Sequence, residues 1–592
     1  MPRLIEGMDA LRSRSSNLAG QALIAVVLCA LLALTGRLVY INAHHGPRLL
    51  ARADRQQRSV IPLKHRRGLI VDCRGRIISG TLLRKSVFAD PKILPDKEAA
   101  ARSAAKALGL EPGELCQDML AAGDRRFFVI CRGATAEQAE KIKKAGFYGL
   151  GVFDEPYRTY PMNGLLAAMV GFVSPDGRGV SGLEHQCDAW LRGENGLKTI
   201  IRDARRKAFW LADGGYRPAR DGFHVVLTID TEIQATVERE LAARVEQYDA
   251  ESGVAIVMHP KTGAILAMAN VPGFDPNHYG DYSPSRYRNR SITDPYEPGS
   301  TFKPFIAAAA LAEGKANLGE VFDCELGMWQ DGQRVLHDHH PYGLLTFEEV
   351  VIKSSNIGMA KIGKRLGNEK LYEYVKAFGF GEKTGVGLAG EDSGIVRPLA
   401  RWDTYTTTSV PMGYEVAVTP LQLARAFCSW ANGGMLVRPY VIRAVLAADG
   451  RVVRDFSDPP PQGRVLPAEI ANTIRDKILC NVVNEGTGSR ARLASHQVFG
   501  KTGTARISRK GGRGYERKAY VASFIGAAPA RDPQLVVLVA IRRPDPSLAY
   551  YGGTVAAPVV REVLAHSLAY LQIPPDPPGR TLTAMLPSAV TD

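Results

Sequence analysis

The segment Ser15–Gly36 carries no charge and consists mainly of Ala, Leu, Val and Ile. A helix rises about 1.5 Å per residue, so these 22 residues span roughly 33 Å, enough to cross the hydrocarbon core of a bilayer. Three arginines precede the segment, which favours a cytoplasmic N-terminus. The alternative is a cleaved signal peptide, but no small-residue cleavage site follows the apolar run. We expect a cytoplasmic segment at 1–16, a single-pass membrane anchor at 17–41, and the bulk of the chain on the extracytoplasmic (periplasmic) side.

The composition of the whole chain is that of a globular protein with a large core. It has 592 residues, of which 45% are hydrophobic and 23% charged, enough for two to four domains. A net charge of +15 fits nucleic acid, an anionic membrane surface or an acidic partner. No zinc-finger spacing, RNA-binding aromatic motif or long basic helix is present, so we expect no nucleic-acid partner. The eight cysteines include no C-x-x-C pair, which fits neither a zinc ribbon nor a disulfide scaffold.

The region that follows the anchor mixes short strands, helices and loops. Residues 68–78 form a predicted hairpin, and Lys97–Leu108 and Ala136–Ala145 have helical periodicity. We find no group of catalytic side chains there. We therefore expect residues 42–224 to form an elongated mixed α/β pedestal, a dimerisation-type domain.

Strands at both ends of the next region indicate one α+β domain at 225–573. Gly253–Met258 and Ala264–Ala269 read as two strands joined by a tight turn, and Ala519–Ala527 and Gln534–Arg542 as two more near the end. Helical runs lie before, between and after these strands. We expect a central antiparallel sheet, closed by N- and C-terminal strands and flanked by helices. The proline-rich tail at 574–592 is expected to be disordered.

A serine and a lysine lie one helical turn apart in the segment Tyr296–Phe305. Pro298-Gly299 marks a turn, and the alanine-rich run after Phe305 reads as a buried helix, so Ser300 lies at its N-terminus and Lys303 follows on the same face. A desolvated, neutral lysine can take the proton of a serine hydroxyl and make it a nucleophile. The alternative is a serine that only caps the helix beside a solvated lysine. An isolated S-x-x-K does not distinguish the two.

A second polar pair lies in a bend between two predicted helices. Thr346 to Glu349 form a capping box that begins one helix, and another helix follows Asn356. Ser354 and Asn356 can both point into a cleft from this bend. Ser354 can then pass a proton to a leaving amine, and Asn356 can hold Lys303 and a substrate amide. Alone, S-x-N equally describes an ordinary helix connector.

The triplet Lys-Thr-Gly occurs three times. The copy that begins at Lys261 fills a hairpin turn, and the copy at Lys383 lies in a glycine-rich loop. The copy formed by Lys501, Thr502, Gly503 and Thr504 precedes a hairpin and reads as an edge strand. Such a strand can present an ammonium group, two hydroxyls and a free backbone N–H to a bound peptide, while the glycine keeps the wall open. We therefore choose Lys501.

S-x-x-K, S-x-N and K-T-G-T, in this order, form the motif set of penicillin-recognising acyltransferases. The chain resembles the division-specific class B penicillin-binding proteins, which are peptidoglycan D,D-transpeptidases. The resemblance covers nearly the whole exported chain and includes further motifs: 288–303, Thr419–Gln422, Gly552–Pro558, Arg67-Gly68, Arg158–Pro161 and Gly182–Glu184. Cys73 and Glu415 depart from the family, which often has arginine and usually has glycine there. Asn356, in place of aspartate, indicates the septal and sporulation branch.

The resemblance implies acyl transfer on stem peptides that end in D-Ala-D-Ala. Ser300 would be the nucleophile, Lys303 its base, Ser354 the proton donor, and Asn356 and Lys501 further catalytic residues. Thr502, Gly503 and Thr504 would bind substrate, and the N–H groups of Ser300 and Thr504 would form an oxyanion hole. A positive Lys501 would help to keep Lys303 neutral.

The implied partners are stem peptides, lipid-linked nascent glycan, β-lactams, the cell membrane, a polytopic glycosyltransferase and other divisome proteins. No metal or nucleotide cofactor is implied. Cys324 with His337, His339 and His340 forms either a metal site or a polar surface loop. A D,D-carboxypeptidase or β-lactam-hydrolysing relative, a penicillin-sensing receptor and a mainly scaffolding divisome component are alternative functions.

Overall fold

The computed structural model divides into two compact units: residues 1–65 with 194–220, and residues 66–193 with 221–592. It describes the following residues: 2–123, 125, 127–202, 208–457, 459–509, 511 and 514–576. From residue 577 onward, the predicted proline-rich tail lies outside the described residues.

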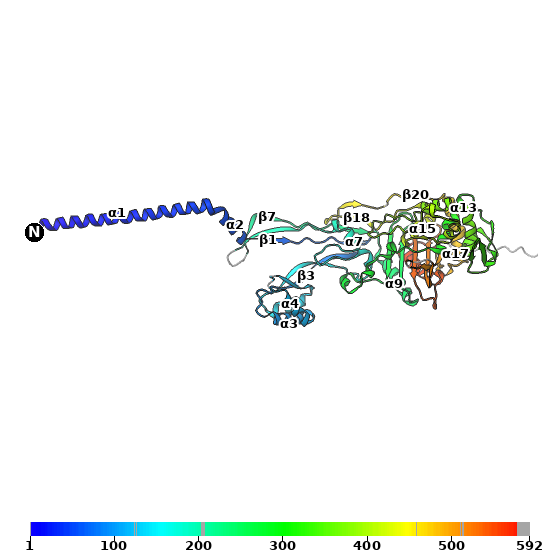
Figure 1. Cartoon of the computed structure of the whole chain (residues 1–592), viewed down its shortest axis with the longest axis horizontal. Coiled ribbons are helices and arrows are strands. Elements are labelled where there is room, and N and C mark those ends of the chain that lie inside the picture. Colours follow the sequence, from blue (N-terminus) through cyan, green and yellow to red (C-terminus); the bar gives the residue numbers. More distant parts are fainter. Residues whose placement is uncertain are drawn as a thin grey trace, which may run out of the picture. The chain divides into compact units, whose positions relative to one another are not determined.

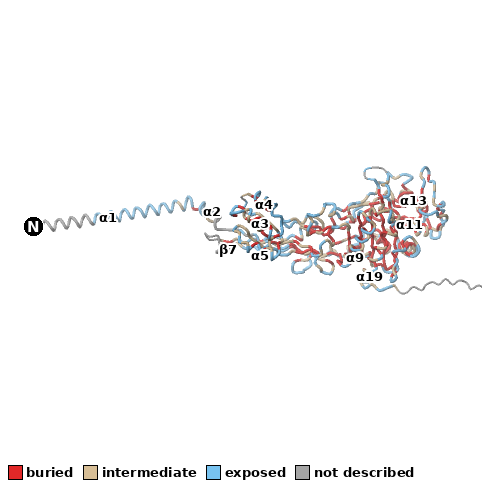
Figure 2. The backbone as a smooth tube through the Cα atoms, turned by 90° about the horizontal axis from the view of Figure 1, so that it is seen from below, coloured by how far each residue is buried: buried red, intermediate tan, exposed pale blue. Residues whose placement is uncertain are grey.

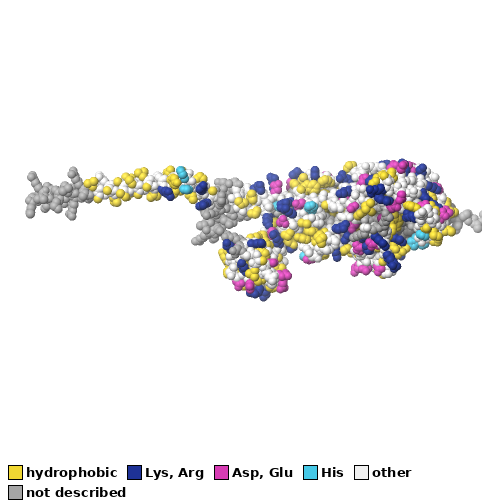
Figure 3. All heavy atoms as spheres, in the orientation of Figure 1, with side chains coloured by type: hydrophobic (Ala, Val, Ile, Leu, Met, Phe, Trp, Pro, Cys, Tyr) yellow, Lys and Arg dark blue, Asp and Glu magenta, His cyan; other side chains and the backbone are white. Residues whose placement is uncertain are grey.

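The first unit consists of an N-terminal helix and a small sheet. Helix α1 (Pro2–Tyr40) continues through a π-helical turn (Ile41–His45) into α2 (Gly46–Gln57). Strands β1 (Arg58–Leu63), β6 (Gly196–Arg202) and β7 (Ala208–Arg217) pair antiparallel in the order β1-β6-β7. The helical segment Asn17–Ala53 is long and apolar enough to cross a membrane, and hydrophobic side chains cover the described part of α1 (Figure 3). This helical segment contains residues 17–41, which were predicted as the anchor, and continues to Ala53.

The second unit begins with the pedestal elements (Figure 1). Strand β3 (Ile77–Ala89) pairs with β2 (Ile70–Val71), β4 (Phe128–Ala134) and β5 (Leu150–Thr159). Helices α3 (Lys97–Leu108) and α5 (Ala136–Ala145) have the predicted bounds, and α4 (Pro112–Ala121) lies between them in sequence. The bounds are sharp because both ends of α3 and α5 are capped: Asp96 and Thr135 accept N-terminal N–H groups, and a left-handed glycine follows each helix.

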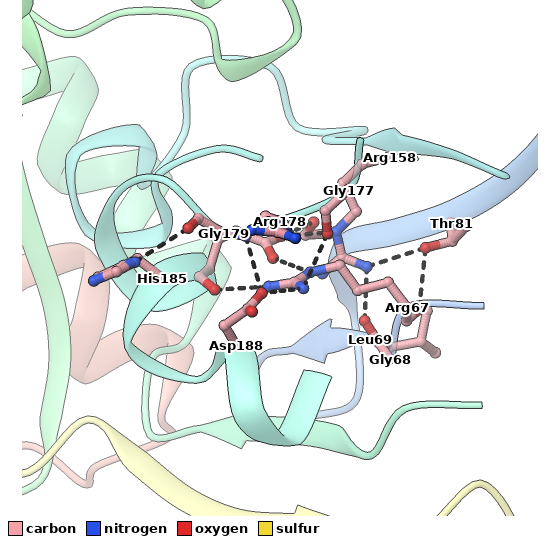
Figure 4. A network of polar contacts seen from close by, with 12 residues as sticks. Arg67, Gly68, Leu69, Thr81, Arg158, Gly177, Arg178, Gly179, His185 and Asp188 are labelled. Atoms are coloured by element: carbon pink, nitrogen blue, oxygen red, sulfur yellow. Dashed lines mark hydrogen bonds and ion pairs between the residues drawn. The ribbon is translucent and has the colours of Figure 1, made fainter. Parts of the chain in front are cut away.

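A buried ion-pair network holds the pedestal strands to helix α7 (Gly182–Gln186) (Figure 4). The Glu184 carboxylate is fully buried and lies 2.6 Å from Arg67 Nε and 2.7 Å from Arg158 Nε. It also accepts a hydrogen bond of 2.8 Å from Ser79 Oγ, while Arg67 Nη1 donates to Asp188 at 2.5 Å. The pedestal motifs that carry the family resemblance therefore meet in one buried cluster.

The remainder of the second unit is built on a five-stranded antiparallel sheet in the order β10-β9-β23-β22-β21. Its strands are β9 (Ser252–Met258), β10 (Ile265–Val271), β21 (Phe499–Ser508), β22 (Tyr515–Ala528) and β23 (Leu535–Arg542). β9 pairs with β23, so N- and C-terminal strands close the sheet. This confirms the predicted α+β architecture.

Helices cover both faces of this sheet. Alternate residues of β9 enter two different cores: Ala255 and Val257 pack in the core of α9 (Thr231–Gln247) and α19 (Ala557–Tyr570). Val254 and Ile256 pack in the core of α11 (Lys303–Ala312), α13 (Asn356–Ala377) and α15 (Pro420–Ala431). Every residue of β9 is buried, which explains its continuous apolar sequence. Figure 2 shows buried residues concentrated around α9, α11 and α19.

The remaining elements are short. The helices are α6 (Ala167–Val170), α8 (Asp188–Leu191), α10 (Arg290–Thr293), α12 (Phe347–Ile352), α14 (Thr406–Ser409), α16 (Ala468–Thr473), α17 (Cys480–Asn484) and α18 (Gly552–Val555). The strands are β8 (His224–Leu227), β11 (Val321–Asp323), β12 (Met328–Asp331), β13 (Arg334–His337), β14 (Leu344–Thr346), β15 (Ile395–Val396), β16 (Val416–Ala417), β17 (Met435–Leu436), β18 (Ile442–Leu446), β19 (Val452–Asp455) and β20 (Gly463–Arg464).

Candidate active site

Ser300 lies in a tight turn at the beginning of α11. We expected it at the helix N-terminus, but the structure places it in a 3₁₀ turn (Gly299–Phe302), and α11 begins at Lys303. Gly299 has φ +55°, a left-handed conformation that the Pro-Gly pair allows, and its N–H donates to Gly413 O at 3.1 Å. Ser300 is half-buried, whereas Lys303 is fully buried. The turn therefore leaves the serine partly accessible and directs the lysine into the protein.

The bend between α12 and α13 meets the Lys303 ammonium group. Lys303 Nζ donates to Ser354 O at 2.6 Å, to Asn356 Oδ1 at 2.8 Å and to Ser354 Oγ at 3.2 Å. Ser354 has φ +64°, a strained conformation for a residue with a side chain. Ser355 Oγ caps α13 by accepting a bond of 3.0 Å from Gly358 N. The bend thus directs the first and third residues of S-x-N to the same ammonium group.

The edge strand β21 brings the third motif to the same hydroxyl. Lys501 Nζ lies 3.1 Å from Ser354 Oγ, so this oxygen lies within hydrogen-bond distance of two lysines, Lys303 and Lys501. The Thr502 hydroxyl bonds that of Thr487 at 2.7 Å, and Thr504 Oγ1 accepts a bond of 3.2 Å from Gly552 N. Residues 303, 354, 356 and 501 therefore form one contact cluster.

Gly503 allows β21 to approach the turn that carries Ser300. A Cβ atom at Gly503 would lie 2.5 Å from Ser523 Oγ, 2.8 Å from the Thr301 side chain and 3.0 Å from Pro298 O. Such distances exclude any larger residue without movement of β21 or the turn. The glycine thus allows direct contact between the strand and the turn that carries Ser300.

The other two Lys-Thr-Gly triplets have structural surroundings of a different kind. Lys261 is exposed and pairs with Asp532 on the surface. Lys383 is exposed, and the buried Thr384 donates its hydroxyl to Glu391 at 2.5 Å. Of the three lysines, Lys501 is the one that contacts Ser354.

Burial lowers the pKa of both lysines of the cluster. Burial lowers the pKa of Lys303 to about 7, while the charges of Asp338 and Cys324 act in the opposite direction. Burial also lowers the pKa of Lys501, and the nearby charge of Lys303 lowers it further. Repulsion between two ammonium groups is mutual, so a charged Lys501 also favours the neutral form of Lys303, in addition to the larger effect of burial. A buried lysine with a pKa near neutrality can act as a base.

Asp338 also belongs to this site, although the sequence motifs do not predict it. Its carboxylate accepts hydrogen bonds from the backbone N–H groups of Asn356 and Ile357, the latter at 3.1 Å, and from Ser355 Oγ at 2.6 Å. An aspartate at a helix N-terminus is recognisable when it directly precedes the helix. Asp338 reaches α13 from a separate hairpin, so no local sequence signal indicates this contact.

The cysteine and histidines considered for a metal site do not gather into one. Cys324 is buried and lies 3.3 Å from Ser355 Oγ, whereas His337, His339 and His340 are exposed. His339 Nε2 forms a 2.6 Å hydrogen bond with Tyr551 OH. Within the part of the chain that the structure describes, no three His, Cys, Asp or Glu residues are arranged to hold a metal.

The two departures from the resembled family, Glu415 and Cys73, lie in different surroundings. Glu415 has φ +63°, a conformation that favours glycine, and its carboxylate forms an ion pair with Arg397. Cys73 is half-buried, with its thiol 3.7 Å from Asp230 Oδ2. Burial and the Asp230 charge raise the pKa of this thiol to about 11, so it is protonated at neutral pH. Neither residue belongs to the contact cluster around Ser354.

Comparison with known proteins places this site in a family. A model of the penicillin-binding protein transpeptidase domain matches residues 253–565, and one of the penicillin-binding protein dimerisation domain matches 62–227. The chain is 35% identical to stage V sporulation protein D of Bacillus subtilis (strain 168), over 91% of this chain and 83% of that protein. It is 32% identical to peptidoglycan D,D-transpeptidase FtsI of Escherichia coli (strain K12), over 93% of this chain and 91% of that protein.

A solved structure shares the fold along almost its whole length. The crystal structure of penicillin binding protein 3 from Mycobacterium tuberculosis, complexed with aztreonam, matches with a TM-score of 0.67 and 28% identity. The match covers 88% of this chain and 99% of that one. Together with the two domain matches and the relatives above 30% identity, it confirms the resemblance seen in the sequence: the chain belongs to the class B penicillin-binding proteins, a family of serine-type D,D-transpeptidases.

Proposed function

We propose that Ser300 is the nucleophile of a peptidoglycan D,D-transpeptidase whose acyl donor is a stem peptide ending in D-Ala-D-Ala. The observation that supports this most is the Ser354 hydroxyl, which lies 3.2 Å from Lys303 Nζ and 3.1 Å from Lys501 Nζ, in a buried cluster next to the Ser300 turn. Three motifs far apart in sequence supply these groups. An arrangement of this kind is needed to activate a serine and to protonate a leaving amine.

In the first step, neutral Lys303 takes the proton of the Ser300 hydroxyl. Ser300 Oγ forms a bond with the carbonyl carbon of the penultimate D-Ala, and the carbonyl oxygen becomes an oxyanion. The backbone N–H groups of Ser300 and Thr504 stabilise this oxyanion, and each such donor contributes about 3 kcal/mol. The lowered pKa of Lys303, about 7, makes its neutral form available near neutral pH.

In the second step, the C–N bond to the terminal D-Ala breaks. The proton moves from Lys303 through the Ser354 hydroxyl to the departing nitrogen, along the 3.2 Å hydrogen bond. An amine from a neighbouring stem then attacks the acyl-enzyme, loses its proton by the reverse route and releases Ser300. β-Lactams acylate the same oxygen by opening of their ring amide.

The remaining polar groups of the cluster hold the donor. Lys501, Thr502 and Thr504 bind the terminal carboxylate, and Gly503 keeps the strand close to the turn. Asn356 binds a substrate amide while its Oδ1 keeps the 2.8 Å bond to Lys303. A carboxylate next to Lys501 favours the charged form of this lysine, which burial alone disfavours.

We also propose the setting in which this reaction takes place. The N-terminus lies in the cytoplasm, residues 17–41 anchor the chain, residues 42–224 form the pedestal, and residues 225–573 carry out catalysis on the periplasmic side. The relatives named for sporulation and as FtsI support a role in septal or sporulation wall synthesis. The chain then works with a polytopic glycosyltransferase and other divisome proteins on lipid-linked nascent glycan.

A fluorescent penicillin tests the nucleophile. We expect covalent labelling of the full-length protein in detergent, with the label on the peptide that contains Ser300. Ser300→Ala removes the labelling, whereas Ser285→Ala, a change of an exposed serine, leaves it unchanged. Equal labelling of a folded Ser300→Ala variant contradicts the assignment.

A synthetic donor tests the reaction type. Incubation of a pentapeptide donor ending in D-Ala-D-Ala with and without an amine acceptor distinguishes cross-linking from trimming. We expect an amide product that requires the acceptor. Release of D-Ala at the same rate without an acceptor, and no cross-linked product with it, identifies a carboxypeptidase instead.

A further inference from the structure

The Ser354 hydroxyl, in the 354–356 bend, contacts both Lys303 and Lys501. Asp338 contacts the other two residues of this bend, Ser355 and Asn356. It follows β13 and reaches the N-terminus of α13 from outside that helix. One carboxylate oxygen accepts from Asn356 N and from Ile357 N, the latter at 3.1 Å, and the other accepts from Ser355 Oγ at 2.6 Å. Two orphan N–H groups of α13 and a buried hydroxyl are therefore satisfied by one side chain.

His337, the residue before Asp338, also holds the 354–356 bend in place. Asn356 Nδ2 donates to His337 O at 2.9 Å, so Asn356 is held both at its amide N–H and at its side chain by consecutive residues of one segment. These bonds orient Asn356 Oδ1 toward Lys303 Nζ, 2.8 Å away. They also fix the backbone next to Ser354, whose φ of +64° persists only when its surroundings define it.

The Asp338 carboxylate carries no ion pair among the described residues. The hydrogen bonds that it accepts come from neutral groups, and no Lys, Arg or His nitrogen of the described chain lies within ion-pair distance of it. Its negative charge is therefore not cancelled by a partner at the protein surface. The charged or ionisable groups that act on the Lys303 ammonium group are Asp338, Cys324 and Lys501.

We propose that Asp338 is a positioning residue of the acylation site, which fixes the 354–356 bend and places a negative charge next to Asn356, whose side chain contacts Lys303 Nζ. This inference rests on the proposed function in one respect, the role of Lys303 as the base. It makes two separable statements, one about geometry and one about charge.

The charge statement follows from Coulomb attraction. A carboxylate near a buried ammonium group favours the charged form and so opposes the effect of burial on Lys303. Without that charge Lys303 is neutral at a lower pH and is available as a base there. It is also a weaker base, so the maximal rate at high pH falls by a small factor.

Asp338→Asn separates the two statements because an amide can keep the contacts. Its Oδ1 accepts from Asn356 N and Ile357 N as the carboxylate does. Its Nδ2 donates to Ser355 Oγ, and the Ser355 hydroxyl proton can turn to Cys324 Sγ, which is 3.3 Å away. Asp338→Ser provides a second neutral variant that keeps one acceptor at the helix N-terminus. Asp338→Ala removes both the contacts and the charge.

The experiment measures the acylation rate of the full-length protein by a fluorescent penicillin between pH 5 and 9. For the wild type the rate rises with pH as Lys303 loses its proton. For Asp338→Asn we expect this limb to move about one pH unit to lower pH, so that the variant is faster than the wild type at acidic pH. For Asp338→Ala we expect a rate at least about tenfold lower at every pH, because the bend is no longer held. Asp323→Asn, which removes an exposed carboxylate of strand β11, leaves the profile unchanged.

Each outcome decides one statement. If the acylation rate rises over the same pH range in the wild type, Asp338→Asn and Asp338→Ser, the charge statement is overturned. If Asp338→Asn does not fold, the comparison of the wild type with Asp338→Ser decides the charge statement. A wild-type rate in folded Asp338→Ala overturns the positioning statement. Labelling of Ser300→Ala, by contrast, overturns the proposed function and not the contacts of Asp338. The two failures are therefore distinguishable.

Discussion

Ser354 combines backbone strain with a central place in the proposed proton path, so its two smallest replacements should separate stability from activity. Its φ of +64° costs a residue with a Cβ about 1–2 kcal/mol relative to glycine. Glycine loses about 0.5–1 kcal/mol more backbone entropy on folding, which offsets part of that gain. We therefore expect Ser354→Gly to be more stable than Ser354→Ala by about 0.5–1 kcal/mol net, because alanine keeps the strain.

Activity should not follow this order. Both variants lack the oxygen that lies 3.2 Å from Lys303 Nζ and 3.1 Å from Lys501 Nζ. Loss of a positioned proton-transfer group typically costs a factor of about 10² to 10⁴ in rate. Both variants should therefore be slower by at least about 10² in acylation, with glycine no faster than alanine.

The assay follows two quantities in the same detergent. Stopped-flow mixing with a fluorescent penicillin gives the acylation rate, and thermal unfolding gives the stability, where we expect Ser354→Gly to melt roughly 1–2 °C above Ser354→Ala. Gln572, with φ +56° near the end of the chain, is the matched control. Gln572→Gly should exceed Gln572→Ala in stability without any change in acylation. A Ser354→Ala variant that acylates at the wild-type rate refutes the relay, and equal melting of Ser354→Gly and Ser354→Ala refutes the strain argument.

Two further substitutions test the frame around the site. Glu184→Gln leaves two buried guanidinium groups without their shared carboxylate and should destabilise the pedestal by about 3–5 kcal/mol, measured as loss of thermal stability. Since Glu184 has a lowered pKa in the folded state, the wild-type stability should be full above the ordinary glutamate pKa and fall as the pH drops through the lowered one. Gly503→Ala places a Cβ 2.5 Å from Ser523 Oγ and should slow acylation at least about 10²-fold by moving β21. Gly113→Ala, where the added atom meets nothing within 4 Å, is the control, and equal labelling of both glycine variants contradicts this account.

Elements with local signals could be predicted from the sequence. Helices α3 and α5 have the expected bounds because caps and left-handed glycines define both ends, and β9 and β23 were recognisable as buried apolar runs. The position of Ser300 could not be placed as precisely, because the difference between a 3₁₀ turn and the first turn of a helix depends on the contact of Gly299 with Gly413. That contact joins segments far apart in sequence.

The candidate site shows the same division. The motif residues could be chosen from sequence because each has a recognisable local pattern, and the edge position of β21 distinguished Lys501 from Lys261 and Lys383. Asp338 could not be chosen, because its partners are the N–H groups of a helix that begins 18 residues later. The burial that lowers the pKa of Lys303 depends on how α11, α13 and β21 pack together, which no local pattern shows. Local patterns identify reactive side chains, whereas tertiary packing decides their protonation.

The burial of two lysines beside one serine hydroxyl is difficult to explain as a device for stability. An unpaired ammonium group is costly to remove from water, and Lys303 and Lys501 are both fully buried without an ion pair to a carboxylate among the described residues. Their mutual repulsion adds to the cost, so burial and repulsion together favour a neutral form of at least one of the two lysines. In the proposed mechanism, the terminal carboxylate of the donor peptide changes this balance because it places a negative charge beside Lys501. The same burial keeps Lys303 neutral enough to take the serine proton. The burial of the two ammonium groups therefore costs stability, but in the proposed mechanism it favours both the recognition of an anionic substrate and the activation of the nucleophile.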